Sequence, residues 1–164
     1  MQRHSRIQKE LHQSRPFRSS TVEAGASILR TAALIRYYLN AVLEPHGLTW
    51  PQYNVLRILR GAGPGGLPTR AIGDRMVDLT PGVTRLVDRL VDKGYVERTR
   101  GTEDHRHVLC SLTGRGAELL ARLEATVDAA DDFMMSGLDE ERLGTLIELL
   151  DGVRMVLVPE VVAG

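Results

Sequence analysis

The densest group of chemically reactive side chains in this sequence lies in one short stretch, RTRGTEDHRHVLCSLT, which runs from Arg98 to Thr113. Carboxylates, imidazoles and a thiol together could bind a transition metal, form a catalytic cluster or respond to oxidants. Guanidinium groups in the same place could instead contact an anion. The side chains concerned are Glu103, Asp104, His105, Arg106, His107 and Cys110. The elements that position these groups decide between the four interpretations.

Two runs of strand character frame these polar side chains. Residues 95–100 and 107–112 are strand-like, and in the second run apolar and outward side chains alternate with a period of two. Residues 101–106 join the two runs. The stretch therefore predicts a β-hairpin with a charged tip.

The spacing within this hairpin argues against a metal site. His105 and His107 share one face of an extended strand, but Cys110 lies three residues after His107 and faces the opposite side. A catalytic cluster would need a nucleophile and a base inside a pocket, and a hairpin tip encloses nothing. Cys110 alternates with Val108 and Leu112 on the apolar side, which favours a buried structural thiol. We therefore predict no metal, no cofactor and no enzymatic activity.

The hairpin follows two short helical segments separated by a turn. LPTRAIGDRM, residues 67–76, predicts the first helix, and VDL predicts the turn. Thr80 is a natural N-cap and Pro81 a natural first residue for the second helix, which extends to Lys93 and ends before Gly94. Its apolar stripe consists of Val83, Leu86, Val87 and Leu90. Helix, turn, helix and hairpin in this order form a winged helix-turn-helix.

The outer face of the second helix suits contact with DNA. Its small and hydroxyl side chains let a base edge approach closely, and Arg85 is long enough to reach O6 and N7 of a guanine. Thr80 and the helix N-terminus suit a phosphate. The face consists of Gly82, Thr84, Arg85, Asp88, Arg89 and Asp92. On an isolated helix the arginines could do no more than pair with the neighbouring aspartates, but the position before a wing favours DNA.

Longer helices lie on both sides of this segment. Residues 21–44 and 113–135 have apolar side chains at three- and four-residue steps, and a last helix opens on Asp139. Another helix begins after Thr49, with Gln52 three residues beyond this N-cap. The apolar stripes of the long helices are wider than the small winged lobe could cover, so we expect a partner surface.

The composition shows no global preference for nucleic acid. The 164 residues include 21 Lys/Arg and 21 Asp/Glu, so any attraction to DNA must come from a local patch. Residues 1–18 form a basic arm, with five Lys/Arg against one Glu. The single cysteine and the absence of a membrane-length apolar run or a signal-peptide centre lead us to expect a cytoplasmic protein without a membrane contact.

Two motifs carry a family resemblance. They are VTRLVDRLVDKGYVER, which begins at Val83, and the D-x-R from Asp104 to Arg106, followed by LT…G. With these motifs, the segment from Leu67 to Leu120 resembles the MarR family of bacterial transcription regulators, and the flanking long helices fit the same family. The resemblance implies a mainly α protein with a small β-hairpin (α+β), a winged helix-turn-helix with long N- and C-terminal dimerisation helices.

The resemblance also implies a homodimer that binds double-stranded DNA. Residues 1–48 would form an N-terminal arm and dimerisation helix, 49–112 the winged helix-turn-helix DNA-binding domain, and 113–164 the C-terminal dimerisation helices. The interlocked helices would carry the winged lobes below them in a triangular outline. A twofold dimer requires a palindromic operator, with recognition helices about one helical turn of DNA apart.

In this family the D-x-R arginine of the wing enters the minor groove. The corresponding residue here is Arg106, with Asp104 orienting the tip. A narrow A·T-rich groove has an enhanced negative potential that attracts a guanidinium. Many members have Asp-Arg-Arg at this point, whereas this chain has His105 in the middle position. His105 would add a positive charge only when protonated.

The resemblance further implies an effector pocket between the dimer helices and the winged lobe, often for small aromatic or phenolic acids. Three of the four tyrosines and the only tryptophan of the chain lie within residues 37–53, although ordinary packing at a helix junction would produce the same cluster. The candidate lining residues are Arg36, Tyr37, Tyr38, His46, Trp50 and Tyr53, with Arg30 as an alternative carboxylate partner. An effector would act by changing the separation of the two recognition helices.

The sequence thus predicts a homodimeric, sequence-specific DNA-binding transcription regulator, a repressor of a palindromic operator that a small ligand releases. Zero net charge favours one alternative, a winged-helix protein-interaction module that does not bind DNA. A thiol- or metal-responsive sensor is a second alternative. Arg85, Arg89 and Arg106 on the expected DNA face favour the regulator.

Overall fold

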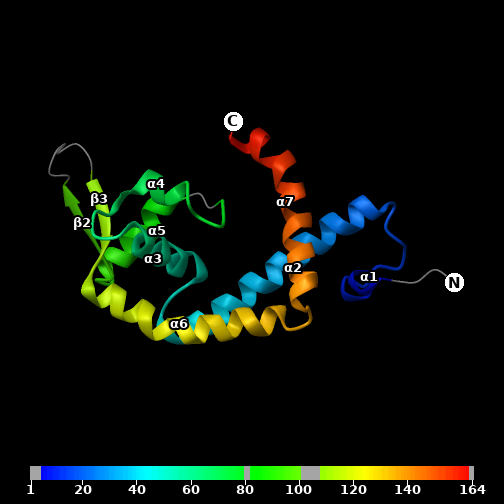
Figure 1. Ribbon diagram of the computed structural model, residues 1–164, viewed down its shortest axis with the longest axis horizontal. Coiled ribbons are helices and arrows are strands. Elements are labelled where there is room, and N and C mark those ends of the chain that lie inside the picture. The colour runs from blue at the N-terminus through cyan, green and yellow to red at the C-terminus, as the bar shows by residue number, and fades with distance from the viewer. Residues whose placement is uncertain (1–4, 80–81, 101–107, 163–164) are drawn as a thin grey trace. The chain divides into compact units, whose positions relative to one another are not determined.

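A computed structural model of the protein describes residues 5–79, 82–100 and 108–162 (Figure 1). The chain divides into two compact units, residues 1–124 and 125–164. The helices of the described residues are α1 (Arg6–Glu10), α2 (Ser20–Leu43), α3 (Trp50–Ala62), α4 (Thr69–Gly73), α5 (Val83–Asp92), α6 (Gly114–Met135) and α7 (Glu140–Val162), with a 3-10 turn η1 (Glu44–His46) after α2. This mainly helical architecture with a small sheet confirms the predicted fold class.

A three-stranded antiparallel sheet holds the predicted hairpin. Strands β2 (Val96–Arg100) and β3 (Val108–Leu112) pair along their whole length, with Val96 opposite Leu112 and Arg98 opposite Cys110. A short strand, β1 (Leu67–Pro68), pairs with the other edge of β3, so the strand order is β1-β3-β2. The hairpin prediction is therefore confirmed within one residue at each strand end.

Strand β1 corrects the prediction of a helix over residues 67–76. The residue before a proline is restricted to extended conformations, which places Leu67 in a strand, and Pro68 is itself extended as the N-cap of α4. Gly66 precedes the strand with φ at 65°, and a Cβ there would lie 2.5 Å from the Cys110 carbonyl oxygen. This close approach of the backbone to β3 excludes any larger residue at position 66.

Helix α3 is the central helix of the winged lobe. Thr49 and Gln52 form the predicted capping box, in which the Thr49 hydroxyl accepts from the Gln52 N–H and the Gln52 side chain accepts from the Thr49 N–H. Val55, Leu56 and Leu59 are 0–1% exposed. Their burial against the neighbouring elements stabilises the lobe through the loss of apolar surface to water.

Helix α5 begins later than predicted. Its N-cap is Gly82, with φ at 99°, so the helix starts at Val83 rather than at Pro81. A left-handed residue cannot continue a helix, which is why the Thr80–Pro81 signal did not mark the first turn. Thr80 and Pro81 themselves lie outside the described residues.

The C-terminal end of α5 agrees with the prediction. Gly94 has φ at 70°, and its N–H donates to the Val91 carbonyl at 2.8 Å, while the Tyr95 N–H donates to the Leu90 carbonyl at 3.0 Å. This pair of bonds satisfies the last carbonyls of the helix and turns the chain into β2. Val87 and Leu90 of the predicted apolar stripe are fully buried, and Val83 and Leu86 are half-buried.

The start of α6 is bonded to the turn before the hairpin. The Thr113 hydroxyl donates to the Gly94 carbonyl at 2.7 Å and accepts from the Gly116 N–H at 3.1 Å, which confirms Thr113 as the N-cap. A Cβ at Gly116 would lie 2.2 Å from the Tyr95 carbonyl oxygen, so only glycine permits this contact. The predicted stripe of α6 is buried at Leu119, Leu120, Leu123, Val127 and Ala130.

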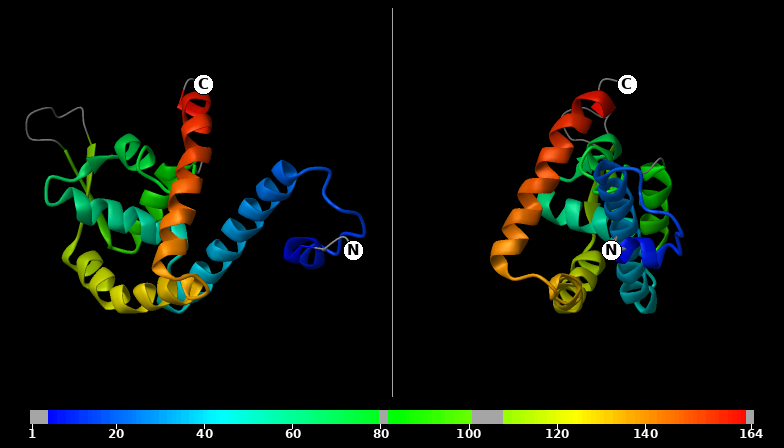
Figure 2. Two further views of the ribbon diagram at one scale, coloured as in Figure 1. Left: turned by 45° about the vertical axis from the view of Figure 1, so that its right-hand side comes forward. Right: turned by 90° about the vertical axis from the view of Figure 1, so that its right-hand side faces the viewer.

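The N-terminal segment is anchored through α1. Figure 2 shows α1 near the N-terminal end of α2, at the opposite end of that helix from the sheet. Ile7 and Gln8 are 8% and 4% exposed, and the Gln8 side chain donates to the Arg15 carbonyl at 3.2 Å. Within the basic arm, α1 is therefore packed through Ile7 and Gln8, whereas residues 9–16 are exposed.

In the second unit, α7 begins where the acidic residues predicted it. The Asp139 carboxylate accepts from the Arg142 N–H at 2.9 Å, as an N-cap does. The apolar residues that follow are largely exposed, among them Ile147, Leu149, Val153, Met155 and Val156. No helix in the described part of the chain is long and apolar enough to cross a membrane.

Candidate nucleic-acid interface

The outer face of α5 is open to solvent, as the sequence predicted. Gly82, Thr84, Arg85 and Arg89 are all exposed, whereas Asp88 is half-buried. Arg85 and Arg89 are four residues apart, so their guanidinium groups lie on the same side of the helix, one turn apart. This face combines two permanent positive charges with small side chains near the helix start.

Asp88 makes an ion pair with the wing rather than with its own helix. Its carboxylate lies 2.6 Å from Nη2 of Arg98 on β2. The hydrogen bond to Asp88 raises the pKa of the Arg98 guanidinium above its ordinary value, with a smaller contribution from Cys110. Neither Arg85 nor Arg89 makes an ion pair with any residue that the structure describes, so both can contact an external anion.

Cys110 is fully buried at the centre of the sheet. It faces Arg98 across the hairpin, and its Sγ lies 3.7 Å from the Thr69 hydroxyl. Val108, predicted on the same buried side, is 45% exposed. Val108 is the first residue of β3, and the pairing of β1 with β3 reaches only Leu109 and Cys110.

The tip of the wing carries three of the predicted DNA contacts, Asp104, His105 and Arg106, and these lie outside the described residues. The strands that lead to the tip are described, and β2 is joined to α5 by the ion pair between Arg98 and Asp88. No group of three His, Cys, Asp or Glu side chains that could hold a metal occurs among the residues described.

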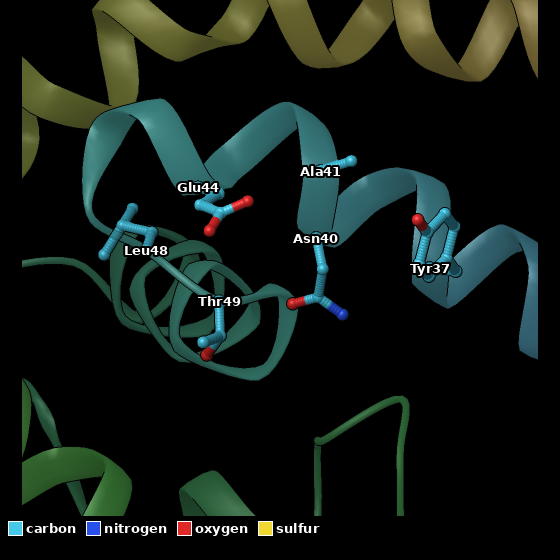
Figure 3. Close-up of a pocket in the computed structure, with 6 residues that line it drawn as sticks. All are labelled: Tyr37, Asn40, Ala41, Glu44, Leu48 and Thr49. Atoms are coloured by element: carbon cyan, nitrogen blue, oxygen red, sulfur yellow. The ribbon is translucent and has the colours of Figure 1, made fainter.

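A surface cavity of about 330 Å³ lies where α2 meets the start of α3. Figure 3 shows Tyr37, Asn40 and Ala41 along one stretch of α2 and Glu44 just beyond it at the start of η1, with Thr49 across from Asn40. The Asn40 side-chain oxygen accepts from the Trp50 N–H at 2.8 Å, and its amide donates to the Arg36 carbonyl at 2.8 Å. Asn40 thereby joins α2 to the first turn of α3. The lining residues are Tyr37, Asn40, Ala41, Glu44, Leu48 and Thr49.

Of the six residues predicted to line an effector pocket, Tyr37 lines this cavity. Arg36 lies beside it in the sequence but pairs with Asp78 at 3.6 Å. The rings of Trp50 and Tyr53 lie 6.0 Å apart, and Tyr53 is buried. His46 is exposed in η1, and Tyr38 is half-buried on α2. The prediction relied on clustered aromatic residues. The cavity instead lies along one helical face, at steps of three and four residues from Tyr37.

Sequence reasoning overlooked one buried polar residue of this region, Asn54. It lies on α3, is 7% exposed, and accepts the Val77 N–H at 2.9 Å. A buried amide that satisfies a loop N–H fixes the path of that loop. The sequence carries no signal for this contact, because the two residues are 23 positions apart.

Comparisons with known proteins agree with this arrangement. Residues 46–107 match a sequence model of the MarR family. The chain is 34% identical over 108 residues to an HTH-type transcriptional repressor of Mycobacterium tuberculosis, which spans 65% of this chain and 76% of the relative. These relatives are transcription regulators and not enzymes.

Solved structures show the same fold. A MarR transcription factor from Planctomyces limnophilus is 38% identical, with a TM-score of 0.64 over 83% of this chain and 98% of that one. A mutant MarR from E. coli in complex with operator DNA is 27% identical, with a TM-score of 0.74 over 85% of this chain and 99% of that one. The winged helix-turn-helix and these similarities show that the chain belongs to the MarR family of transcription regulators.

Proposed function

We propose that this transcription regulator is a homodimeric repressor that binds a palindromic operator in the cytoplasm. The observation that carries the proposal is the exposed face of α5, where Arg85 and Arg89 are not paired with any described residue. The E. coli MarR with a similar fold binds operator DNA, and the M. tuberculosis relative is a repressor. Both facts support the same role for this chain.

In this proposal α5 reads bases in the major groove. Arg85 donates two hydrogen bonds from its guanidinium to O6 and N7 of a guanine, and this bidentate contact discriminates between base pairs. Gly82 and Thr84 add little bulk beside it, and a Cβ at Gly82 would meet nothing within 4 Å. Arg89 contacts the phosphates beside the site, as do Thr80 and Pro81 from the sequence that precedes the helix.

The wing contributes a second contact in the minor groove. Arg106 enters the groove, Asp104 orients it, and His105 lies beside the phosphates. The ion pair between Arg98 and Asp88 connects the wing strand directly to the recognition helix. This ion pair supports the proposal that the wing and the recognition helix meet the DNA as one rigid surface.

Dimerisation would use the helices outside the winged lobe, residues 1–48 and 113–164. The support is the exposed apolar surface of α7, where Leu149 is 66% exposed, Met155 77% and Val156 72%. Leu29 on α2 is similarly exposed, at 72%. Large apolar side chains this exposed are costly in water, and a second copy packed on each helix would remove them from it.

A small-molecule effector would bind near the junction of α2 and α3. A cavity of about 330 Å³ falls at the lower end of the range for ligand pockets, and Tyr37 and Asn40 offer aromatic and hydrogen-bonding contacts. The other predicted contacts belong to the elements that form this junction, and they are Arg36, Tyr38, His46, Trp50 and Tyr53. An effector that fits only one arrangement of α2 and α3 would shift the population of DNA-binding dimers.

Selection of bound sequences from a random DNA pool tests the proposal. We expect enrichment of an inverted repeat with half-site centres about 10 base pairs apart, because two α5 helices of a twofold dimer reach successive major grooves. A pool that remains random after selection would instead favour the protein-interaction module.

A further inference from the structure

The segment that leads into the recognition helix is held by few apolar contacts. We call Val77–Leu79 the lead segment. Val77 is 69% exposed and Leu79 is 82% exposed, whereas Met76 just before them is 8% exposed. Among the described residues between Met76 and Val83, none has a buried side chain. Apolar burial, which positions most of the lobe, therefore does little to fix the path of this segment.

Two polar contacts hold the lead segment instead. The Val77 N–H donates to the buried Asn54 side chain of α3 at 2.9 Å. The Asp78 carboxylate lies 3.6 Å from Nη1 of Arg36 on α2. The Asp78 side chain is 23% exposed and that of Arg36 is 46% exposed, so the pair is partly shielded from solvent. The lead segment is thus tied to two different helices at adjacent residues.

We propose that Arg36 and Asn54 are positioning residues for DNA recognition, because they fix the lead segment and through it the start of α5. The inference rests on the proposed function, in which α5 reads the operator. Asp78 lies five residues before Val83, the first residue of that helix. Arg36 also adjoins Tyr37, a lining residue of the cavity, so one helix reaches both the cavity and the lead segment.

A displaced recognition helix loses base contacts before it loses phosphate contacts. Hydrogen bonds to base edges tolerate only small changes in distance and angle, whereas phosphate contacts depend mainly on charge. The positioning role therefore has a specific signature. Loss of the ion pair lowers affinity for the operator but leaves affinity for random DNA unchanged, and it shifts the thermal unfolding midpoint no more than loss of the Arg60–Glu124 pair does.

The experiment compares two ion pairs of the same kind. Arg36→Gln and Asp78→Asn each remove the contact to the lead segment. The matched control is Arg60→Gln, which removes the ion pair from Arg60 to Glu124, a 3.3 Å contact with exposures of 45% and 55% that joins α3 to α6. Operator and random duplexes are titrated by fluorescence anisotropy at one salt concentration.

We expect Arg36→Gln and Asp78→Asn to lower operator affinity by roughly two- to fivefold for each subunit, the range for a partly exposed pair. The charge-exchanged double variant, Arg36→Asp with Asp78→Arg, recovers part of this loss. Arg60→Gln binds as the wild type does. Hydrogen–deuterium exchange at the Val77 amide becomes faster in Arg36→Gln and stays unchanged in Arg60→Gln.

Three results would overturn the inference. In the first, Arg36→Gln binds the operator as well as Arg60→Gln does, while the wild type binds normally. In the second, the affinity loss is equal on operator and random DNA. In the third, exchange at the Val77 amide is unchanged. A wild-type protein that binds no DNA overturns the proposed function, and the inference with it.

Discussion

Helices α5 and α7 differ in whether their apolar side chains are buried within the chain. On α5, Val87 and Leu90 are fully buried within the chain, and the polar face remains exposed. On α7, Leu149, Met155 and Val156 are exposed even though the helix is well formed. A helix that already has its packing partner is free to recognise something polar with its other face, whereas α7 has apolar surface left to bury.

The first prediction concerns the buried side of this comparison and has the largest expected effect. Leu90→Ala should lower the free energy of unfolding by about 2–5 kcal/mol, because it leaves a cavity in the lobe. Urea denaturation measures the loss. The matched change on the other helix, Leu149→Ala, should alter the stability of separated subunits by less than about 0.5 kcal/mol. Equal losses in the free energy of unfolding from the two changes would contradict this difference between the helices.

The second prediction concerns the exposed side. Leu149→Glu combined with Met155→Glu should raise the dimer dissociation constant more than about tenfold, because each dimer would bury unpaired charges. Sedimentation velocity at micromolar concentration measures the change, with circular dichroism as the control for helix content. A wild type that sediments as a monomer would contradict the assignment of α7 to dimerisation.

The third prediction separates the two arginines of the α5 face. Arg85→Ala should cost about 1–3 kcal/mol of operator affinity and relax specificity at particular base pairs. Arg89→Ala serves as the comparison. It should weaken binding to all sequences and reduce the slope of log affinity against log salt concentration by about one. Anisotropy titrations over a series of single base-pair changes distinguish the two. A uniform loss from Arg85→Ala would assign it to a phosphate.

The fourth prediction concerns the contact between α5 and the wing. Asp88→Asn should weaken operator binding by about 0.2–1 kcal/mol, because the pair with Arg98 is partly exposed and contributes modestly. The loss should come from the minor-groove contact, so Asp88→Asn should have little further effect in an Arg106→Ala background. Additive losses in that double-mutant cycle would show that the ion pair does not act through the wing.

The fifth prediction expects the smallest effect. Cys110 is fully buried, so treatment with peroxide should leave operator binding unchanged in the wild type and equally unchanged in Cys110→Ser. Anisotropy before and after oxidant measures this. A peroxide response that disappears in Cys110→Ser would support the thiol-sensor alternative.

Local signals predicted most of the helices and the hairpin. Thr49, Gln52, Gly94 and Thr113 act through neighbours within a few residues, so their roles follow from spacing alone. Strand β1 was missed because it depends on pairing with Cys110, far along the chain. The start of α5 was misplaced because Thr80 and Pro81 form a good capping signal two residues before the observed cap.

The candidate site was predicted in part. The outward face of α5 follows from amphipathic periodicity, and the structure shows its arginines exposed. The contacts of Arg36 with Asp78, of Asn54 with Val77 and of Arg98 with Asp88 are tertiary, and no sequence spacing encodes them. The cavity at Asn40 was not predicted, because aromatic clustering also selects residues that are packed in the interior. Tyr53 is one of these, and it does not line the cavity.

The central claim is that two α5 helices of one dimer read two half-sites together. The most direct measurement is an anisotropy titration of the selected operator beside a duplex in which one half-site is scrambled. We predict one dimer per intact operator and a loss of roughly 1–3 kcal/mol for each mismatched base pair in the scrambled half, up to the level of non-specific binding. Equal affinity for the two duplexes, or one subunit per operator, would contradict the claim.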